Sequence, residues 1–528
     1  MRFANAPPAR AVNDRANVAA QPVPRAFVRW LYNYDGQFQR RITRALELHR
    51  PERARGINAL DEVPNSTWFT NRIGVRDVSP EEIATAPGGV GSPEAFKPWT
   101  IVSTKVGGMS VGFIIKDTRG EKFLLKFDPR GLPEAETATQ VIVGKLLWAF
   151  GYNVTEDYVL YVHKQDLVLA PDAVVKDIFG HKSPLGQREL DKRLALIETA
   201  ADGRIRVLVS HWLPGKPLGG HAAEGVRGDD PNDRIPHELR RDLRGAYAVF
   251  SWLDHFDIHE GNMLDVWVGD PADPKRHYVK HYWVDYGVAL GFSAKKNVDA
   301  RYGYEFYWDP AAMARSLLSF GALERPWEQR KWRDVRGLGL YETDLYDPGA
   351  WVSSSAAYVP IYVADRIDKF WASKILIRFT RDQIKAAVDS AQLSDPKAAA
   401  WLVDALIARQ RATARYWFER VNPLDEPAIA DDTLCFKDLA IAHAFAPAGN
   451  THYAITTYDH AGTQLAATDA PAGDSGVTCT RLGLAADRNG YTIVRVDTTR
   501  PQFTGTTYFH LARDPTTQAA RVIGVWRP

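Results

Sequence analysis

The stretch DHFDIHEGNML, residues 254–264, has the most informative spacing of polar residues in the chain. It places a carboxylate, Asp257, five residues before a carboxamide, Asn262. A second carboxylate, Asp285, ends a later aromatic-rich segment and is followed closely by Gly287. Phosphoryl transfer uses such a set, because one Asp receives the proton of the acceptor hydroxyl while an Asn and a second Asp hold Mg²⁺ against nucleotide phosphates.

Two short motifs in this region are informative in combination. The pattern HxDxHxGN fixes five positions over residues 255–262, and a chance match has odds on the order of one in ten thousand. The triplet DYG at 285–287 carries no weight alone, but it follows in the order that the chemistry requires. Turn formation is the alternative reading of Asp257 and Asn262, and the position of Asp285 argues against it.

These motifs resemble the protein-kinase-like superfamily. The first is similar to the catalytic loop of atypical kinases and of aminoglycoside and choline phosphotransferases, and DYG is similar to the metal-binding DFG. The resemblance implies that Asp257 is the catalytic carboxylate and that Asn262 and Asp285 bind Mg²⁺ beside ATP. His259, also counted with the catalytic set, is interpreted as a brace for the loop in preference to a zinc ligand. Phe256 stands where many protein kinases have a phosphate-reading Arg, which argues against activation by loop phosphorylation.

Residues 99–128 are typical of a strand, a glycine-rich turn, a second strand, a hairpin and a third strand. Gly107, Gly108 and Gly112 fit a turn that cradles phosphates, because backbone N–H groups must approach without intervening side chains. They do not spell GxGxxG, so an ordinary hairpin stays open as the alternative. Lys126, on the third strand, is predicted to hold the phosphates, and an edge lysine facing water is the alternative.

A helix is predicted over residues 133–150, with Pro at its start and Gly just beyond its end. By the resemblance, an acid in its first turn pairs with Lys126. Glu134 is the first choice and Glu136 the second, although acids in a first turn are also favoured by the helix dipole alone. Lys122, nearer the hairpin, is the weaker candidate for the phosphate-binding cation.

The apolar strand predicted over residues 204–212 leads into a Pro-Gly turn, as a hinge between lobes would. The resemblance implies that residues 210–213, among them His211 and Leu213, bind the adenine of the nucleotide. A long amphipathic helix, predicted over residues 236–255, then delivers the catalytic loop.

The fold class predicted from this order is α+β, a two-lobed protein-kinase-like fold with a C-terminal all-β, sandwich-like accessory domain. We expect an N-terminal arm and helical wrap (1–96), an N-lobe (97–215), a helical C-lobe (216–427) and a β-rich domain (428–528). Local expectations are a disordered or loosely attached arm over residues 1 to about 25, helices over 361–391 and 395–420, and a linker over 421–427. Over 25–48 we expect a helix or a broken pair of helices that packs on the body through an apolar stripe of Phe27, Trp30, Leu31, Phe38, Ile42 and Leu46.

Composition sets outer bounds. The chain has 528 residues and a net charge of +2, so nothing points to nucleic acid, and no apolar run is long enough for a membrane span. Cys435 and Cys479 leave one disulfide open. His255 and His259 have the spacing of zinc ligands, but the HExxH glutamate is missing.

The first residues lack an apolar signal core, so the cytoplasm is the default expectation, and export is expected if a signal peptide precedes this sequence.

The functional prediction is an ATP/Mg²⁺-dependent phosphotransferase that moves a phosphoryl group to a hydroxyl of a protein or a small molecule. Two alternatives stay open: a kinase-like, nucleotide-binding scaffold without turnover, and a transferase that moves AMP. The β-rich domain is expected to offer a surface for a partner or a glycan.

Overall fold

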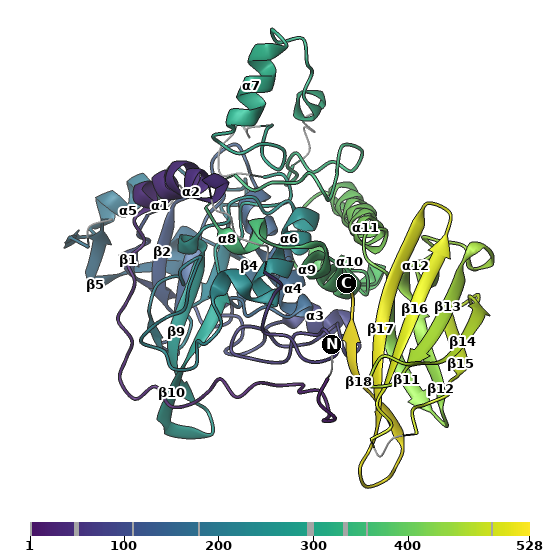
Figure 1. Ribbon diagram of the computed structural model, residues 1–528. Coiled ribbons are helices and arrows are strands. Elements are labelled where there is room, and N and C mark those ends of the chain that lie inside the picture. The colour runs from purple at the N-terminus through teal and green to yellow at the C-terminus, as the bar shows by residue number, and fades with distance from the viewer. Residues whose placement is uncertain are drawn as a thin grey trace.

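The computed structural model describes residues 3–46, 52–107, 110–177, 180–292, 300–330, 336–354, 357–486 and 489–528 (Figure 1). Within these ranges the chain forms one large mixed sheet, three smaller antiparallel sheets and a set of helices. The predicted mixture of α and β structure is confirmed at this coarse level. The division into two lobes and the domain boundaries stay predictions.

The large sheet has the strand order β4-β7-β3-β2-β1-β5-β6. β1 and β5 run parallel, whereas the other neighbours are antiparallel. Buried side chains alternate along β1 and pack with helix α5 in one apolar cluster. The elements are β1 (Trp99–Thr104), β2 (Gly112–Lys116), β3 (Lys122–Lys126), β4 (Asp157–Val162), β5 (Leu167–Lys176), β6 (Lys182–Pro184), α5 (Gln187–Leu194) and β7 (Ile205–His211).

Helix α4 (Ala135–Phe150) is buried along its whole length. It contacts β4 and β7 of the large sheet, and also helices α3 (Pro80–Thr85) and α10 (Arg381–Asp389). Such a helix has no solvent face, so neighbours must cover every side of it. α4 therefore joins the large sheet to the helical part of the molecule.

The helical part differs from the prediction in one respect. The helix predicted over 361–391 is three helices, because Asp365 and Thr380 each cap a new one by accepting hydrogen bonds from backbone N–H groups of its first turn. The helix predicted over 395–420 is present as α11. The remaining elements here are β8 (Lys216–Pro217), α6 (Arg241–Leu253), β9 (Met263–Asp270), β10 (Asp273–Trp283), α7 (Pro310–Leu318), α8 (Val359–Tyr362), α9 (Arg366–Leu376) and α11 (Pro396–Phe418).

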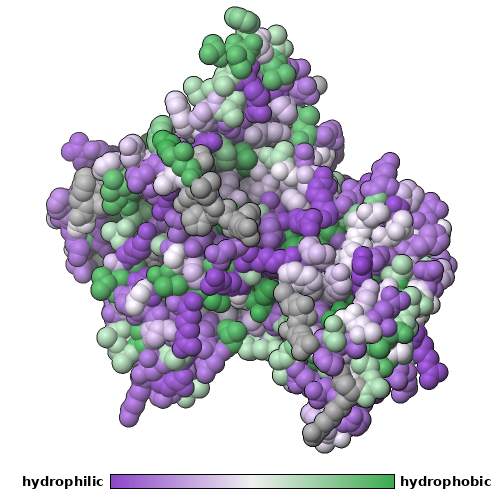
Figure 2. Space-filling model, viewed as in Figure 1, coloured by the Kyte–Doolittle hydropathy of each residue, from purple (hydrophilic) through white to green (hydrophobic). Residues whose placement is uncertain are grey.

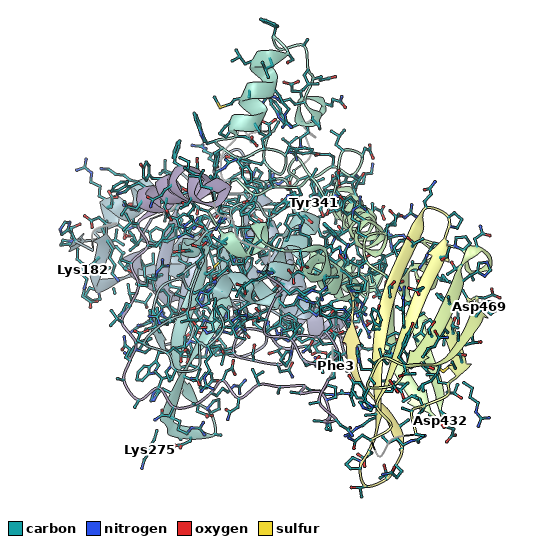
Figure 3. All side chains as sticks on the ribbon, in the orientation of Figure 1. Phe3, Lys182, Lys275, Tyr341, Asp432 and Asp469 are labelled. Carbon is teal, nitrogen blue, oxygen red and sulfur yellow. A yellow bond between two sulfur atoms is a disulfide. The ribbon has the colours of Figure 1, made fainter. Side chains whose placement is uncertain are left out.

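Of the two predicted alternatives for the N-terminal arm, disorder does not hold over residues 3–25. It is an extended segment that runs past β9 and β10 to the C-terminal sheets (Figure 1). The Phe3 ring lies 4.4 Å from the ring of His510 (Figure 3). The Val18 carbonyl accepts a hydrogen bond of 2.9 Å from the indole N–H of Trp267. Partners on distant segments order this stretch, which its composition does not reveal.

Over 25–48 the structure has the broken pair, the second predicted alternative: α1 (Arg29–Tyr34), a π-helical turn (Asp35–Gln39) and α2 (Arg40–Leu46). Its buried contacts come from Tyr32 and Gly36 instead of the predicted apolar stripe. A side chain at Gly36 would collide with Ala357, so glycine permits this close approach. The members of the stripe that face solvent are Trp30, Leu31, Phe38, Ile42 and Leu46.

A second exposed apolar surface lies on the projection that carries α7, which Figure 2 shows as a hydrophobic tip. Leu317, Leu318 and Phe320 are exposed there, Phe320 to 97%. The two surfaces adjoin, because the rings of Phe38 and Trp308 lie 5.5 Å apart. Among the described residues, no helix combines the length and the apolar character needed to cross a membrane.

The C-terminal part consists of two antiparallel sheets around one apolar cluster, and Phe436 and Phe509 stack across it at 5.8 Å. Its first strand begins at Leu424, inside the predicted linker. Cys435 and Cys479 are opposite each other on neighbouring strands and form a disulfide. The three-stranded sheet contains β11 (Leu424–Ala430), β12 (Thr433–Asp438) and β15 (Val477–Arg481), and the five-stranded sheet contains β13 (His452–Tyr458), β14 (Gln464–Pro471), β16 (Thr492–Arg500), β17 (Phe503–Arg513) and β18 (Ala520–Trp526).

Replacing Cys435 and Cys479 together by Ser should destabilise the C-terminal sheets. The bond closes a span of 44 residues, so its loss returns loop entropy worth roughly 4 kcal/mol to the unfolded chain. Denaturant unfolding of the oxidised protein, the reduced protein and the double variant measures this. The reduced protein should match the variant, and equal stability of all three would contradict the pairing.

Candidate active site

Lys126 and Asp285, which are far apart in sequence, form an ion pair in the structure. Lys126 is the last residue of β3 and is buried. Burial disfavours its charge, but the carboxylates of Asp285 and Glu136 outweigh this effect and raise the pKa of Lys126. In return, the Lys126 ammonium lowers the pKa of Asp285 to about 2. Both groups are therefore charged at neutral pH.

The turn that holds Asp285 is set by its neighbours. β10 ends at Trp283. The next residue, Val284, donates a backbone hydrogen bond of 3.0 Å to the Asn262 carbonyl. Asp285 itself has a positive φ of 57°. Tyr286 is fully buried, and a side chain at Gly287 would lie 3.1 Å from Cγ of Glu136. The glycine of DYG thus lets this turn pack against the start of α4.

The catalytic-loop motif follows α6, which begins at Arg241 after a short 3-10 turn and so later than predicted. The side-chain N–H₂ of Asn262 donates to Asp257, at 2.8 Å to the carbonyl and 3.4 Å to carboxylate Oδ2. These bonds use the amide nitrogen, so the amide oxygen of Asn262 is the atom that can bind a cation. The side chain of Asp257 is 26% exposed and accessible to an acceptor.

His259 links the two ends of the loop. Its Nδ1 accepts a hydrogen bond of 3.0 Å from the Gly261 N–H, and its Nε2 lies 3.7 Å from Oδ1 of Asp257. Burial lowers the pKa of His259, so the ring is neutral. Because Nδ1 acts as acceptor, the single proton sits on Nε2 and faces the Asp257 carboxylate. His259 thus contacts both Asp257 and the Gly261 backbone, and its part in catalysis stays a prediction.

The N-terminal segment supports the same loop, a contact that the sequence did not predict. The Phe27 ring stacks on the His259 ring at 5.1 Å with an interplanar angle of 4°. Arg25 forms an ion pair with the buried Glu260. A side chain at Gly261 would lie 2.7 Å from Phe27, so the motif glycine permits the stack. Residues 25–32, called the strap below, are thus part of the site.

Glu134, the first choice as partner of Lys126, has a different role, and the preference is corrected. It lies one residue before α4 with a positive φ of 69°, and its carboxylate accepts hydrogen bonds from Arg336 and from the Ser394 backbone. Glu136 is buried beside Lys126, whose charge acts on it. Burial raises the pKa of Glu136, and its Oε2 has no hydrogen-bond partner among the described residues.

A cavity of about 280 Å³ lies over the ion pair. Its lining includes the predicted hinge residues, Gly107 of the glycine-rich turn and Gly261 of the catalytic-loop motif. The lining residues that bear on the site are Gly107, Lys126, Ser210, His211, Leu213, Gly261 and Asp285. Gly108 lies outside the described residues. Gly112 is corrected: it is the first residue of β2, paired opposite Lys126 in the sheet, where a side chain would lie 2.6 Å from the Leu125 carbonyl. It serves sheet packing.

Two polar groups of the cavity were missed by sequence reasoning. Lys105 lines it, donates a hydrogen bond of 3.0 Å to Ser110, and has a pKa lowered by burial. Gln140 of α4 donates to Asp157 at 3.0 Å, which leaves its Oε1 without a partner among the described residues. The sequence offered one signal for Lys105, namely its position at the start of the glycine-rich turn.

Comparisons with known proteins give weak likenesses. No protein-family model and no curated protein matches the chain. A structure of the Golgi casein kinase with Mn/ADP bound has 12% identity and a TM-score of 0.31, over 61% of this chain and 72% of that one. The Rio2 kinase–ADP/Mg²⁺–phosphoaspartate complex from Chaetomium thermophilum has 15% identity and a TM-score of 0.21, over 59% and 72%. Likenesses of this strength carry no argument about the chemistry of this chain.

A double-mutant cycle should separate the two glutamates. Lys126→Met and Glu136→Gln should couple by roughly 0.5–3 kcal/mol, because the two charges share one buried site. Lys126→Met and Glu134→Gln should be additive within about 0.5 kcal/mol. The free energy of unfolding of the four variants and the wild type measures both couplings. Stronger coupling to Glu134 would contradict the assignment.

Proposed function

We propose that the chain is an ATP/Mg²⁺-dependent phosphotransferase of the atypical-kinase type, acting on a hydroxyl acceptor. The observation that carries the proposal is the meeting of two distant segments at one cavity. Lys126 and Asp285 pair across it, and the backbone bond between Val284 and Asn262 sets the catalytic-loop motif beside them. The carboxylates of Asp257 and Asp285 both act electrostatically on His259.

The residues present fit a nucleotide and a divalent cation. Mg²⁺ prefers oxygen ligands and is commonly held by one or two carboxylates together with substrate phosphates. Asp285 of the cavity lining and the amide oxygen of Asn262, beside the cavity, would supply such oxygens. Lys126 and Lys105 of the lining would supply cations for phosphates. When bound, Mg²⁺ neutralises the charge of the phosphates. The residues at 210–213 would border the adenine, since they line the same cavity.

Asp257 would accept the proton of the acceptor hydroxyl. Its two carboxylate oxygens have different neighbours: Oδ1 faces the Nε2–H of His259, and Oδ2 lies near the amide of Asn262. These donors fix the orientation of the carboxylate toward the acceptor. Phosphoryl transfer depends mainly on such positioning and on electrostatic stabilisation.

A scaffold without turnover is the second candidate, and one contact favours it. Lys126 bonds directly to Oδ1 of Asp285, so a cation that takes Asp285 as ligand must share this carboxylate with Lys126 or displace it. Turnover therefore depends on whether bound phosphates replace Asp285 as the partner of Lys126. Nucleotide binding and transfer must be measured separately.

Nucleotide binding should stabilise the protein only when the cation is present. ATP with Mg²⁺ at about 100 times the dissociation constant adds about 2.7 kcal/mol to the free energy of unfolding. Asp285→Asn should remove the Mg²⁺-dependent share of this stabilisation. The control is Asp474→Ala, which replaces an exposed acid in the C-terminal part and should leave the stabilisation unchanged. Thermal shifts with ATP plus Mg²⁺, ATP plus chelator, and Mg²⁺ alone test this. Equal shifts with and without Mg²⁺ would contradict the assigned ligand.

Transfer to a hydroxyl should depend on Asp257. Asp257→Ala should lower kcat by roughly 100- to 10,000-fold while leaving the ATP-dependent thermal shift in place, because a general base acts in the chemical step. ATP labelled at the γ-phosphate, tested against protein and small-molecule hydroxyl acceptors, measures the rate, with Asp474→Ala as the matched control. Intact mass separates added phosphate from added AMP. Binding without transfer to any acceptor would favour the scaffold.

A further inference from the structure

A second polar centre lies away from the cavity, where His221, Asp265 and His281 meet. Asp265 is on β9, His281 is the residue opposite it on β10, and His221 comes from the segment after β8. Their exposed fractions are 3%, 0% and 4%. One nitrogen or oxygen from each side chain lies within 4.8 Å of the others. Three buried polar side chains on separate segments that point their donor atoms together call for a physical explanation.

The ring of His221 is not satisfied by protein groups. Its Nε2 shares a hydrogen bond of 2.9 Å with the Tyr358 hydroxyl, whereas Nδ1 has no hydrogen-bond partner among the described residues. The nearest carboxylate atom, Oδ1 of Asp265, is 3.6 Å away. If Nδ1 carries the proton, a buried donor lacks an acceptor within bonding distance. If it does not, a lone pair faces a carboxylate. A cation between the two atoms resolves both cases.

The spacing of the donor atoms suits a small tetrahedral site. Bonds of 2.0–2.2 Å to zinc place neighbouring ligand atoms about 3.4 Å apart. The His221 Nδ1 to Asp265 Oδ1 distance of 3.6 Å matches this value. The His281 Nδ1 lies 2.7 Å from the same oxygen, a hydrogen-bond distance. That distance would widen by about 0.7 Å once a cation replaced the shared proton.

Contacts around the three side chains hold them in a ligand-like orientation. Arg227 contacts the other oxygen of Asp265, Oδ2, at 3.3 Å, so Oδ1 is left for the centre. Trp68 stacks on the His281 ring at 3.5 Å, and the Tyr358 hydroxyl fixes His221 from its far nitrogen. Groups that bind the far side of ligands in this way orient metal-binding histidines.

The charge of the surroundings also favours a cation. The carboxylates of Asp230 and Asp233 act electrostatically on His281, in addition to Asp265 itself. The guanidinium of Arg227 offsets one of these three negative charges. The donor set of two imidazoles and one carboxylate suits zinc, whereas Mg²⁺ and Ca²⁺ prefer oxygen ligands throughout.

We propose that His221 Nδ1, Asp265 Oδ1 and His281 Nδ1 form a structural zinc site, completed by a water molecule. The site ties the segment after β8 to the β9–β10 hairpin. β9 begins directly after Asn262, and β10 ends two residues before Asp285. A metal bound to Asp265 and His281 would therefore stabilise the two strands that position Asn262 and Asp285. It is separate from the proposed Mg²⁺ ligands and requires no nucleotide.

Metal analysis of the tag-free, full-length protein, expressed with zinc in the medium and purified without chelator, tests the proposal. About one zinc ion per chain is expected. After removal of the metal, Zn²⁺ should raise the melting temperature, and Co²⁺ should give the visible absorption of a tetrahedral site. Wild-type protein that contains no zinc and shows no response to added Zn²⁺ or Co²⁺ would overturn the proposal without any variant.

Variants locate the metal. His221→Ala should abolish the stoichiometric zinc, and Tyr358→Phe, which removes only the outer hydrogen bond, should weaken zinc affinity by roughly 10- to 100-fold. His237→Ala is the matched control, because this buried neighbour already uses both ring nitrogens on the Ala222 carbonyl and Asp233, so its zinc should be retained. Asp285→Asn should keep its zinc as well. Zinc that persists in His221→Ala would place the metal elsewhere and refute the assignment.

Discussion

The ion pair between the buried Lys126 and the half-exposed Asp285 is the constraint on which the candidate site depends. An ammonium group at the end of a central strand cannot remain charged in the interior unless a carboxylate accompanies it. That requirement fixes the turn after β10 against β3, although the two are distant in sequence. The positive φ of Asp285 and the absence of a side chain at Gly287 are local consequences, because both allow the turn to pack against the start of α4.

Helix α4 transmits this constraint to the rest of the molecule. Its first turn supplies Glu136, its middle carries Gln140, and a side chain at Gly144 would lie 2.8 Å from the Tyr286 ring. Because the helix is buried on all sides, it cannot shift without disturbing the large sheet and α10 together. The cavity is therefore bounded by elements that share one packed interior, which favours preorganised positions for its charged groups.

Sequence patterns located the residues that come together, but not the contacts among their neighbours. The motif around Asp257 and Asn262 is local, so its spacing was visible, and alternation placed Lys126 on a strand. The choice between Glu134 and Glu136 depends on a left-handed residue before α4 and on partners more than 200 positions away, which no periodicity encodes. The order of the N-terminal arm likewise comes from hydrogen bonds to distant segments.

The loop that carries Asp257 and Asn262 is held in place from several directions. The strap stacks on His259 from outside. Phe256, at the position where a phosphate-reading Arg is common, is buried and stacks on Tyr302 at 4.2 Å, while its carbonyl accepts from the Ser354 N–H at 2.9 Å. A ring fixed in a packed interior needs no phosphate to hold it. Packing by itself therefore supplies the order of this loop, without a phosphorylated segment.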